Sequence, residues 1–134
     1  MLRTGKIFAL EYSAIFNKIF FINSLMAQYH RGRSAEYRVI QKLRERGWYT
    51  VRSAGSKGDF DIVAFKGWRT ILVQVKRRQV GDNEFERMVE HYTRIANEYN
   101  LAPHTFSMYL AEVVDGKVRF RTLWGPDFDL VGGM

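Results

Sequence analysis

The clearest periodic pattern in the chain is a run of apolar residues spaced three or four positions apart. Its members are Phe85, Met88, Val89, Tyr92, Ile95, Ala96 and Tyr99. This spacing lines them up along one side of an α-helix. Asp82 or Asn83 is expected to cap the helix. Glu86 is placed to close a capping box from Asn83, and Pro103 marks the end.

An earlier segment has the same helical spacing. Its apolar positions are Ala35, Val39, Ile40 and Leu43. We predict a helix that begins at a Ser34 cap and runs through Arg46, because a serine oxygen can accept a hydrogen bond from the first turn. Gly47 is expected to end it.

Five segments have the residue types and alternation of β-strands: 48–54, 60–65, 70–76, 106–113 and 117–123. We predict that a hairpin turn at 66–69 joins the second strand to the third, and the dipeptide Asp115-Gly116 favours a tight turn between the last two. The predicted order is one helix, three strands, one helix and two strands. It indicates an α/β fold with a mixed central β-sheet flanked by helices.

Residues 1–25 differ from the rest, because they are rich in Phe, Ile, Leu and Tyr. Leu10, Ala14, Phe16, Ile19, Phe20 and Ile22 could form an amphipathic helix. Alternatively, Met26 is the natural start and residues 1–25 are an upstream extension; the sequence leaves both readings open. The apolar run is too short and too polar for a transmembrane helix. We therefore divide the chain into an extension, 1–25, and one domain, 26–134.

Charge points to a polyanionic partner. The 134 residues carry 21 Lys and Arg against 14 Asp and Glu, a formal net charge of +7. Residues 31–78 alone hold 13 basic residues and only four acidic ones. Such a one-sided field attracts phosphate, so nucleic acid is the first candidate partner and an anionic membrane surface the second.

The cysteine and histidine content limits the kinds of catalytic and metal site that the chain can form. The chain has no cysteine, which excludes disulfides, thiolate nucleophiles and cysteine-based zinc sites and is compatible with a reducing cytoplasm. The three histidines, His30, His91 and His104, are too dispersed for a metal-binding motif, and surface or packing roles suit them better.

Four polar residues lie where nuclease chemistry could use them. Asp61 begins an otherwise apolar strand, and Gln74 and Lys76 share one face of the next because side chains alternate. Glu36 lies upstream on the first predicted helix. Phosphodiester cleavage needs a deprotonated water and compensation of developing charge, which a carboxylate-held Mg²⁺ and a nearby Lys supply.

Each of these residues, taken alone, has an ordinary structural explanation. Asp61 could follow a turn, Gln74 could be a satisfied strand residue, Lys76 could protect a sheet edge, and Glu36 could favour a helix N-terminus. Their joint spacing inside the most basic part of the chain favours a site.

The motifs that carry this spacing resemble one family. In order they are Gly32-Arg33-Ser34-Ala35-Glu36, Val51-Arg52-Ser53-Ala54-Gly55-Ser56, Asp61-Ile62-Val63-Ala64 and Gln74-Val75-Lys76-Arg77. Together they are similar to the archaeal-type Holliday junction resolvases, over roughly residues 27–123. The resemblance implies a PD-(D/E)xK, restriction-endonuclease-like core. It also implies a dimeric, Mg²⁺-dependent endodeoxyribonuclease that nicks paired strands near a four-way DNA junction.

Position by position, Glu36 matches the family's helical catalytic Glu, Asp61 its metal-binding Asp and Lys76 its catalytic Lys. Ser53 falls near a loop Ser that helps position the scissile strand. The resemblance and the strand geometry together predict one Mg²⁺ (Mn²⁺ substituting) on Asp61, Gln74 and the Val75 carbonyl, with Glu36 near its shell.

The chain departs from the family pattern at two positions. Phe60 replaces the motif proline, a mild structural change. Gln74 stands where the family carries Glu, so the site loses one negative charge and should hold Mg²⁺ less tightly. Three readings follow: a natural variant that still cuts, which we favour; an engineered or inactive form, which would leave a DNA-binding module; or a site that uses a relocated acid such as Asp59 or Glu36. A related repair or restriction endonuclease remains an alternative.

Partner contacts can be assigned in outline. Basic residues beside the proposed site should contact DNA phosphates: Arg31, Arg33, Arg52, Lys57, Arg77 and Arg78. Two equivalent nicks call for two copies of a one-site chain, so a homodimer is expected. Its contacts could include Trp124 and Phe128 or the ridge of Met88, Tyr92 and Tyr99, for which core packing is the plainer reading.

Overall fold

The computed structural model describes residues 15, 18, 27–53 and 58–132, with the side chains of 27–32 left out. The helix expected around residues 10–22 and the choice of Met26 as a start lie outside these residues. The chain separates into two units, Met1–Arg31 and Gly32–Met134, and the account below concerns the second.

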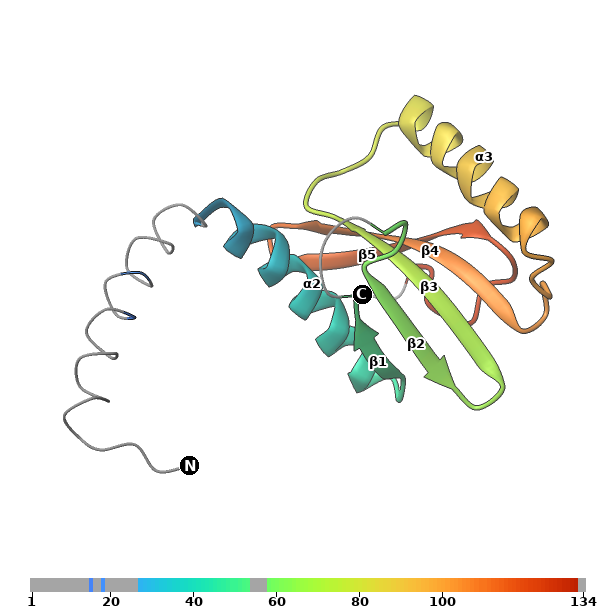
Figure 1. Ribbon diagram of the computed structural model, residues 1–134, viewed down its shortest axis with the longest axis horizontal. Coiled ribbons are helices and arrows are strands. Elements are labelled where there is room, and N and C mark those ends of the chain that lie inside the picture. Colours follow the sequence, from blue (N-terminus) through green and yellow to red (C-terminus); the bar gives the residue numbers. More distant parts are fainter. Residues whose placement is uncertain (1–14, 16–17, 19–26, 54–57, 133–134) are drawn as a thin grey trace. The chain divides into compact units, whose positions relative to one another are not determined.

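The described part of the second unit is a five-stranded sheet with helices (Figure 1). The elements are α2 (Ala27–Glu45), β1 (Tyr49–Arg52), β2 (Ile62–Lys66), β3 (Arg69–Lys76), α3 (Asp82–Glu98), β4 (Phe106–Val114) and β5 (Lys117–Trp124). The strands lie in the order β1-β2-β3-β4-β5, antiparallel except for the parallel pair β3 and β4. The predicted mixed sheet and order of elements are confirmed.

Two turns follow directly from local sequence. Gly47 ends α2 with a φ of 89°, a left-handed conformation that glycine adopts without strain. Asp115 and Gly116 both have positive φ, 51° and 76°, as a two-residue hairpin turn requires. The predicted helix end and the predicted hairpin are therefore confirmed.

Both predicted helix starts were wrong. α2 begins at Ala27 and places Ser34 inside the helix, because no proline interrupts the residues before it. α3 is capped by Gly81 without a side-chain hydrogen bond, so neither Asp82 nor Asn83 acts as the cap. Asp82 and Glu84 instead lie in the first turn, where negative charge favours the helix dipole.

The sheet has two different faces. On the α2 face, apolar residues from the helix and from strands β2 to β5 form one continuous core: Ala35, Val39, Ile40, Leu43, Ile62, Ala64, Ile71, Val73, Tyr109, Ala111, Val113, Val118 and Phe120. Thr50 of β1 is also buried and is in register with Ala64. On the α3 face, a second core joins the helix to β3, β4 and β5 through Tyr92, Ala96, Met108, Leu110, Leu123 and half-buried neighbours. The two helices therefore cover opposite faces (Figure 1).

None of the described helices is both long enough and apolar enough to cross a membrane.

Candidate active site

The centre of the candidate site is Asp61, which precedes β2. Its carboxylate Oδ2 accepts a hydrogen bond from the Val75 backbone N–H at 2.7 Å. Its own backbone is held on both sides, because Asp61 N–H donates to the Val73 carbonyl and the Ser53 N–H donates to the Asp61 carbonyl, each at 2.8 Å. The carboxylate is thus fixed at the point where β2 begins.

The Asp61 carboxylate interacts electrostatically with Lys76 of β3. Partial burial raises the pKa of Asp61, while the Val75 N–H and the charge of Lys76 oppose that rise. A cation bound to this carboxylate would relieve the cost of burying its charge. The charge of Lys76, on β3, therefore acts on the Asp61 carboxylate.

Gln74 and Tyr92 form the second part of the site. The Tyr92 hydroxyl oxygen lies 3.1 Å from the Gln74 carboxamide and 2.9 Å from the Asp59 carbonyl oxygen. Tyr92 is 5% exposed. Burial first, and then the charges of Asp59 and Asp61, raise the pKa of Tyr92 to about 12, so the phenol stays protonated at neutral pH.

A hollow of about 420 Å³ opens beside these residues, between β3 and α3. Its lining includes Gln74 and Lys76 from the strand and Glu84, His91 and Tyr92 from the helix, with Asp59 from the loop before β2. Sequence reasoning placed Tyr92 in a packing ridge and set His91 aside. Nothing in the sequence around His91 and Tyr92 indicates a site, because only the packing of α3 on the sheet brings them to Gln74.

Asp59 and His91 form a pair on this hollow, with His91 Nε2 3.0 Å from Asp59 Oδ1. Both side chains are about half exposed. Asp59 was one of two acids considered as a replacement for the charge missing at Gln74, and the structure places it at the same hollow. Its carboxylate is engaged by His91 rather than by Gln74.

Glu36 is bonded to a residue of β1. Its Oε1 accepts a hydrogen bond from Arg52 Nη1 at 3.0 Å. Arg52 is in register with Ile62, which packs into the core on the α2 face, so the pair reaches the sheet from that side. Among the described residues, no hydrogen bond or ion pair joins Glu36 to Asp61 or Gln74. The hydrogen bond to Glu36 also raises the pKa of Arg52.

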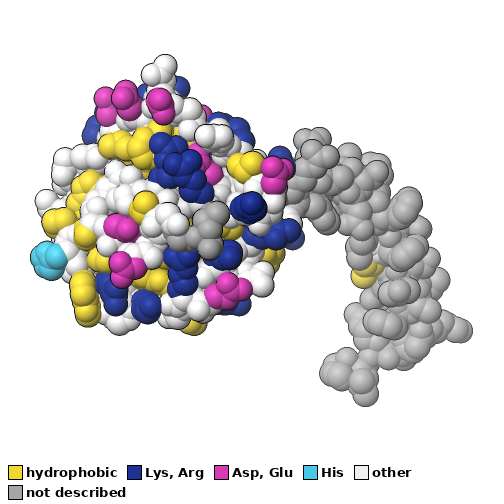
Figure 2. All heavy atoms as spheres, turned by 180° about the vertical axis from the view of Figure 1, so that it is seen from behind, with side chains coloured by type: hydrophobic (Ala, Val, Ile, Leu, Met, Phe, Trp, Pro, Cys, Tyr) yellow, Lys and Arg dark blue, Asp and Glu magenta, His cyan; other side chains and the backbone are white. Residues whose placement is uncertain are grey.

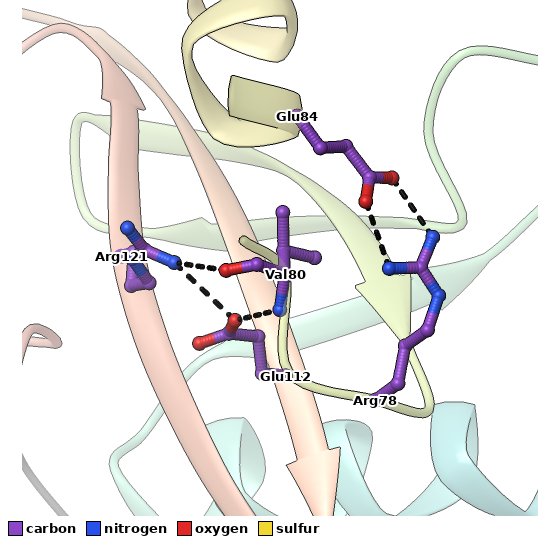
Figure 3. Close-up of polar contacts among 5 residues, drawn as sticks. All are labelled: Arg78, Val80, Glu84, Glu112 and Arg121. Carbon is purple, nitrogen blue, oxygen red and sulfur yellow. Dashed lines mark hydrogen bonds and ion pairs between the residues drawn. The ribbon is translucent and has the colours of Figure 1, made fainter. Parts of the chain in front are cut away.

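The loop that follows Lys76 is tied down at two points (Figure 3). Arg78 makes a two-pronged ion pair with Glu84 of α3, both contacts at 2.8 Å. The buried Glu112 accepts a hydrogen bond from the Val80 N–H at 2.6 Å, and Arg121 contacts both Glu112 Oε2 and the Val80 carbonyl. These contacts hold the end of β3 and the start of α3 in place around the hollow.

The predicted DNA-contacting residues differ in whether their side chains are paired with an acidic residue. Arg33 and Arg77 are exposed, whereas Arg52 and Arg78 are paired with Glu36 and Glu84. The side chain of Arg31 and the whole of Lys57 lie outside the described residues. Figure 2 shows one face of the molecule on which Lys and Arg side chains form several patches between fewer acidic ones.

Core packing accounts for most of the apolar residues considered for a dimer contact. Phe128 is buried against Trp48, with ring centroids 6.4 Å apart. Tyr92 is buried, and Met88 and Trp124 pack against the core on the α3 face. Tyr99 alone of this set is exposed, at 67%.

The donor atoms suit a hard divalent cation. Asp61 offers a carboxylate oxygen, since only its Oδ2 bonds to a described residue, and Gln74 can offer an amide oxygen. Oxygen ligands of this kind are those that Mg²⁺ and Mn²⁺ prefer. Within the described residues, no three acidic or histidine side chains gather as a metal cluster.

Comparison with known proteins gives the family. Among solved structures, the chain is similar to Hjc from Archaeoglobus fulgidus, a Holliday junction resolvase from an archaeal hyperthermophile. The identity is 20%, the match covers 68% of this chain and 76% of the other, and the TM-score is 0.46. None of the curated proteins matches the sequence. The profile described as "Archaeal holliday junction resolvase (hjc)" matches residues 27–99, more than half of the chain and the stretch that contains Asp61, Gln74 and Lys76. The chain therefore belongs to the archaeal Holliday junction resolvase family, whose members are junction-resolving endonucleases.

Proposed function

We propose that this resolvase is Mg²⁺-dependent, that it works as a homodimer in the cytoplasm, and that it nicks two strands of a four-way DNA junction. One observation carries the proposal: within the stretch that matches the family, the Asp61 carboxylate is hydrogen-bonded to the Val75 N–H of β3, between Gln74 and Lys76 in the chain, and is influenced by the charge of Lys76.

Asp61, Gln74 and the Val75 carbonyl would hold the cation. In a strand, the N–H and C=O of one residue point to the same edge, and the Val75 N–H already faces Asp61. When bound, the cation would lower the pKa of a water and offset charge on the phosphate. Lys76 would stabilise the developing oxyanion, while Ser53 would position the scissile strand.

Glu36 would assist from the α2 side of the sheet. Its ion pair with Arg52 ties its carboxylate to the last residue of β1, which Ser53 follows. Arg31, Arg33, Lys57, Arg77 and Arg78 would add phosphate contacts on the DNA arms.

The test is nicking of a labelled four-way junction in Mg²⁺ or Mn²⁺, with Asp61→Asn as the decisive variant. Loss of the carboxylate should reduce cutting by about a hundredfold or more, because charge compensation by the cation is worth several kcal/mol. Junction binding should stay close to that of the parent protein. Asp115→Asn, in the β4–β5 turn, is the matched control. Undiminished cutting by Asp61→Asn would refute the proposal.

An exposed apolar patch suits the proposed dimer. Tyr49, Val51 and Phe65 are 70%, 44% and 43% exposed and lie on one face of β1 and β2, where Tyr49 is in register with Phe65. In an isologous dimer, two copies of such a patch cover each other. Val51→Lys should shift sedimentation at micromolar concentration from dimer to monomer, while Val114→Lys should not. A parent protein that sediments as a monomer and binds junctions singly would contradict the dimer.

A second function rests on Gln74. Because the neutral ligand removes one charge from the site, the chain could bind junctions and cut them poorly. Binding of a junction without any cutting in either metal would support this second candidate.

A further inference from the structure

The Tyr92 hydroxyl sits between two oxygen-bearing groups but has one proton to give. It lies 2.9 Å from the Asp59 backbone carbonyl oxygen and 3.1 Å from the Gln74 carboxamide atom placed as Oε1, so both neighbours stand as acceptors. A backbone carbonyl can only accept a hydrogen bond, so the Tyr92 proton belongs to Asp59. If the proton were turned to Gln74, the Tyr92 and Asp59 oxygens would face each other at 2.9 Å with no hydrogen between them.

The Gln74 carboxamide can resolve this conflict by itself. Its oxygen and nitrogen exchange places by a half-turn about the last side-chain bond, which moves no other group, and hydrogen-bond partners decide between the two arrangements. With Nε2 toward Tyr92, the amide donates to the phenol oxygen and the phenol donates to Asp59. All three groups are then satisfied in a partly buried place, where the Tyr92 side chain itself is buried and an unsatisfied partner would be costly.

From this we infer that Tyr92 is a positioning residue, which holds Gln74 with Nε2 toward the hydroxyl and turns the amide oxygen away from α3, open to a cation. The part concerning the cation rests on the proposed function. The orientation of the amide does not.

This arrangement also gives a local reason for glutamine at position 74. A glutamate there could only accept, so it would compete with the Asp59 carbonyl for the single Tyr92 proton. Glutamine brings the donor that the pair of Tyr92 and Asp59 lacks. Tyr92 is held in turn by packing, because its ring lies 5.0 Å from that of Phe60 and it belongs to the core on the α3 face.

The orientation can be measured without metal or DNA. In the full-length ¹⁵N-labelled chain, the side-chain amide signals of Gln74 are identified by their loss in Gln74→Glu. We expect one Nε2 proton to exchange with water slowly compared with the exposed Gln79. Tyr92→Phe should speed that exchange about five- to tenfold, as expected for loss of one hydrogen bond. Tyr99→Phe, on the same helix at an exposed position, is the control and should change nothing.

The effect on the cation is measured by calorimetric titration with Mn²⁺ alone. Tyr92→Phe should weaken binding about two- to fivefold, because part of the population then presents nitrogen to the ion. In the Gln74→Glu background, where both terminal atoms are oxygens, the same Tyr92→Phe change should have no effect. A merely structural role for Tyr92 would weaken binding equally in both backgrounds.

The results of these experiments distinguish the positioning role of Tyr92 from the proposed metal site. The positioning role is refuted if the Gln74 amide protons exchange as fast as those of Gln79. It is also refuted if Tyr92→Phe leaves their exchange rate unchanged. An equal loss of Mn²⁺ affinity in both backgrounds refutes it as well. The proposed metal site fails on a different result, namely Mn²⁺ binding that survives Asp61→Asn unchanged.

Discussion

The two faces of the sheet are built for different tasks. The α2 face is a continuous apolar core in which Leu43, Ile62, Val73 and Tyr109 are fully buried. The α3 face is covered by helix at β4 and β5, whereas near the start of β2 it leaves polar groups beside an open hollow. Polar side chains on strands can remain accessible only where a face is incompletely covered. Stability and chemistry are thus expected to respond to mutations on opposite faces.

The largest effect should come from breaking the α2 face. Leu43→Ala removes a fully buried side chain and should lower the free energy of unfolding by about 2–5 kcal/mol, because a cavity remains. Met88→Ala, at a half-buried position on α3, should cost clearly less. Urea denaturation followed by circular dichroism measures both. Equal losses would mean that the two faces contribute alike to stability.

A substitution of Glu36 tests whether a residue on the α2 face contributes to DNA cutting. Glu36→Gln should slow single-turnover cutting about tenfold, less than Asp61→Asn, since the Glu36 carboxylate is already bonded to Arg52. The change also frees Arg52, so junction affinity should rise slightly. Glu45→Gln, an exposed acid on the same helix, is the control. A loss as large as that of Asp61→Asn would place Glu36 among the metal ligands.

The charge of the α3-face site is tested at Gln74. Gln74→Glu adds a negative oxygen ligand and should lower the Mg²⁺ concentration for half-maximal cutting by up to about tenfold. A matched exposed change, Gln79→Glu, should leave that concentration unaltered. An unchanged or raised requirement in Gln74→Glu would show that Gln74 is not a ligand or that another acid already compensates.

The smallest effect concerns phosphate contacts in the loop after β3. Arg77→Gln should reduce the slope of log affinity against log salt by about 0.9, the value for one duplex phosphate contact. Arg78→Gln should reduce it less, because Glu84 already pairs with Arg78. Fluorescence anisotropy on a labelled junction at several salt concentrations measures both slopes, with Lys117→Gln as control. Identical slopes for all three variants would exclude this loop from the interface.

The sequence was informative wherever structure depends on nearby residues. The turn at Asp115-Gly116, the helix end at Gly47 and the shared face of Gln74 and Lys76 follow from local conformation and strand alternation. The helix starts did not, because Ser34 and Asn83 are acceptable both as caps and inside helices.

The part of the candidate site that comes from neighbouring strands was also predicted from local sequence. Asp61, Gln74 and Lys76 come from one hairpin, whose strand pairing is readable from the sequence. Tyr92 and His91 reach the site only after α3 crosses the sheet, and the capture of Glu36 by Arg52 depends on how α2 packs. These contacts join a helix to a strand that lies far from it in the sequence. The spacing of residues within one segment carries no information about such contacts.

The single parallel strand pair has a consequence for the way this chain folds. Strands β1, β2 and β3 form one antiparallel group and β4 with β5 another, and each closes through short connections. Joining them requires residues 77–105, with α3 among them, to cross over before β3 can pair with β4. Such non-local pairing is slow because the connecting loop loses entropy before new contacts form. We therefore expect the union of the two groups to limit the refolding rate. The contact between Gln74 and Tyr92, which spans that crossover, should be among the last to appear.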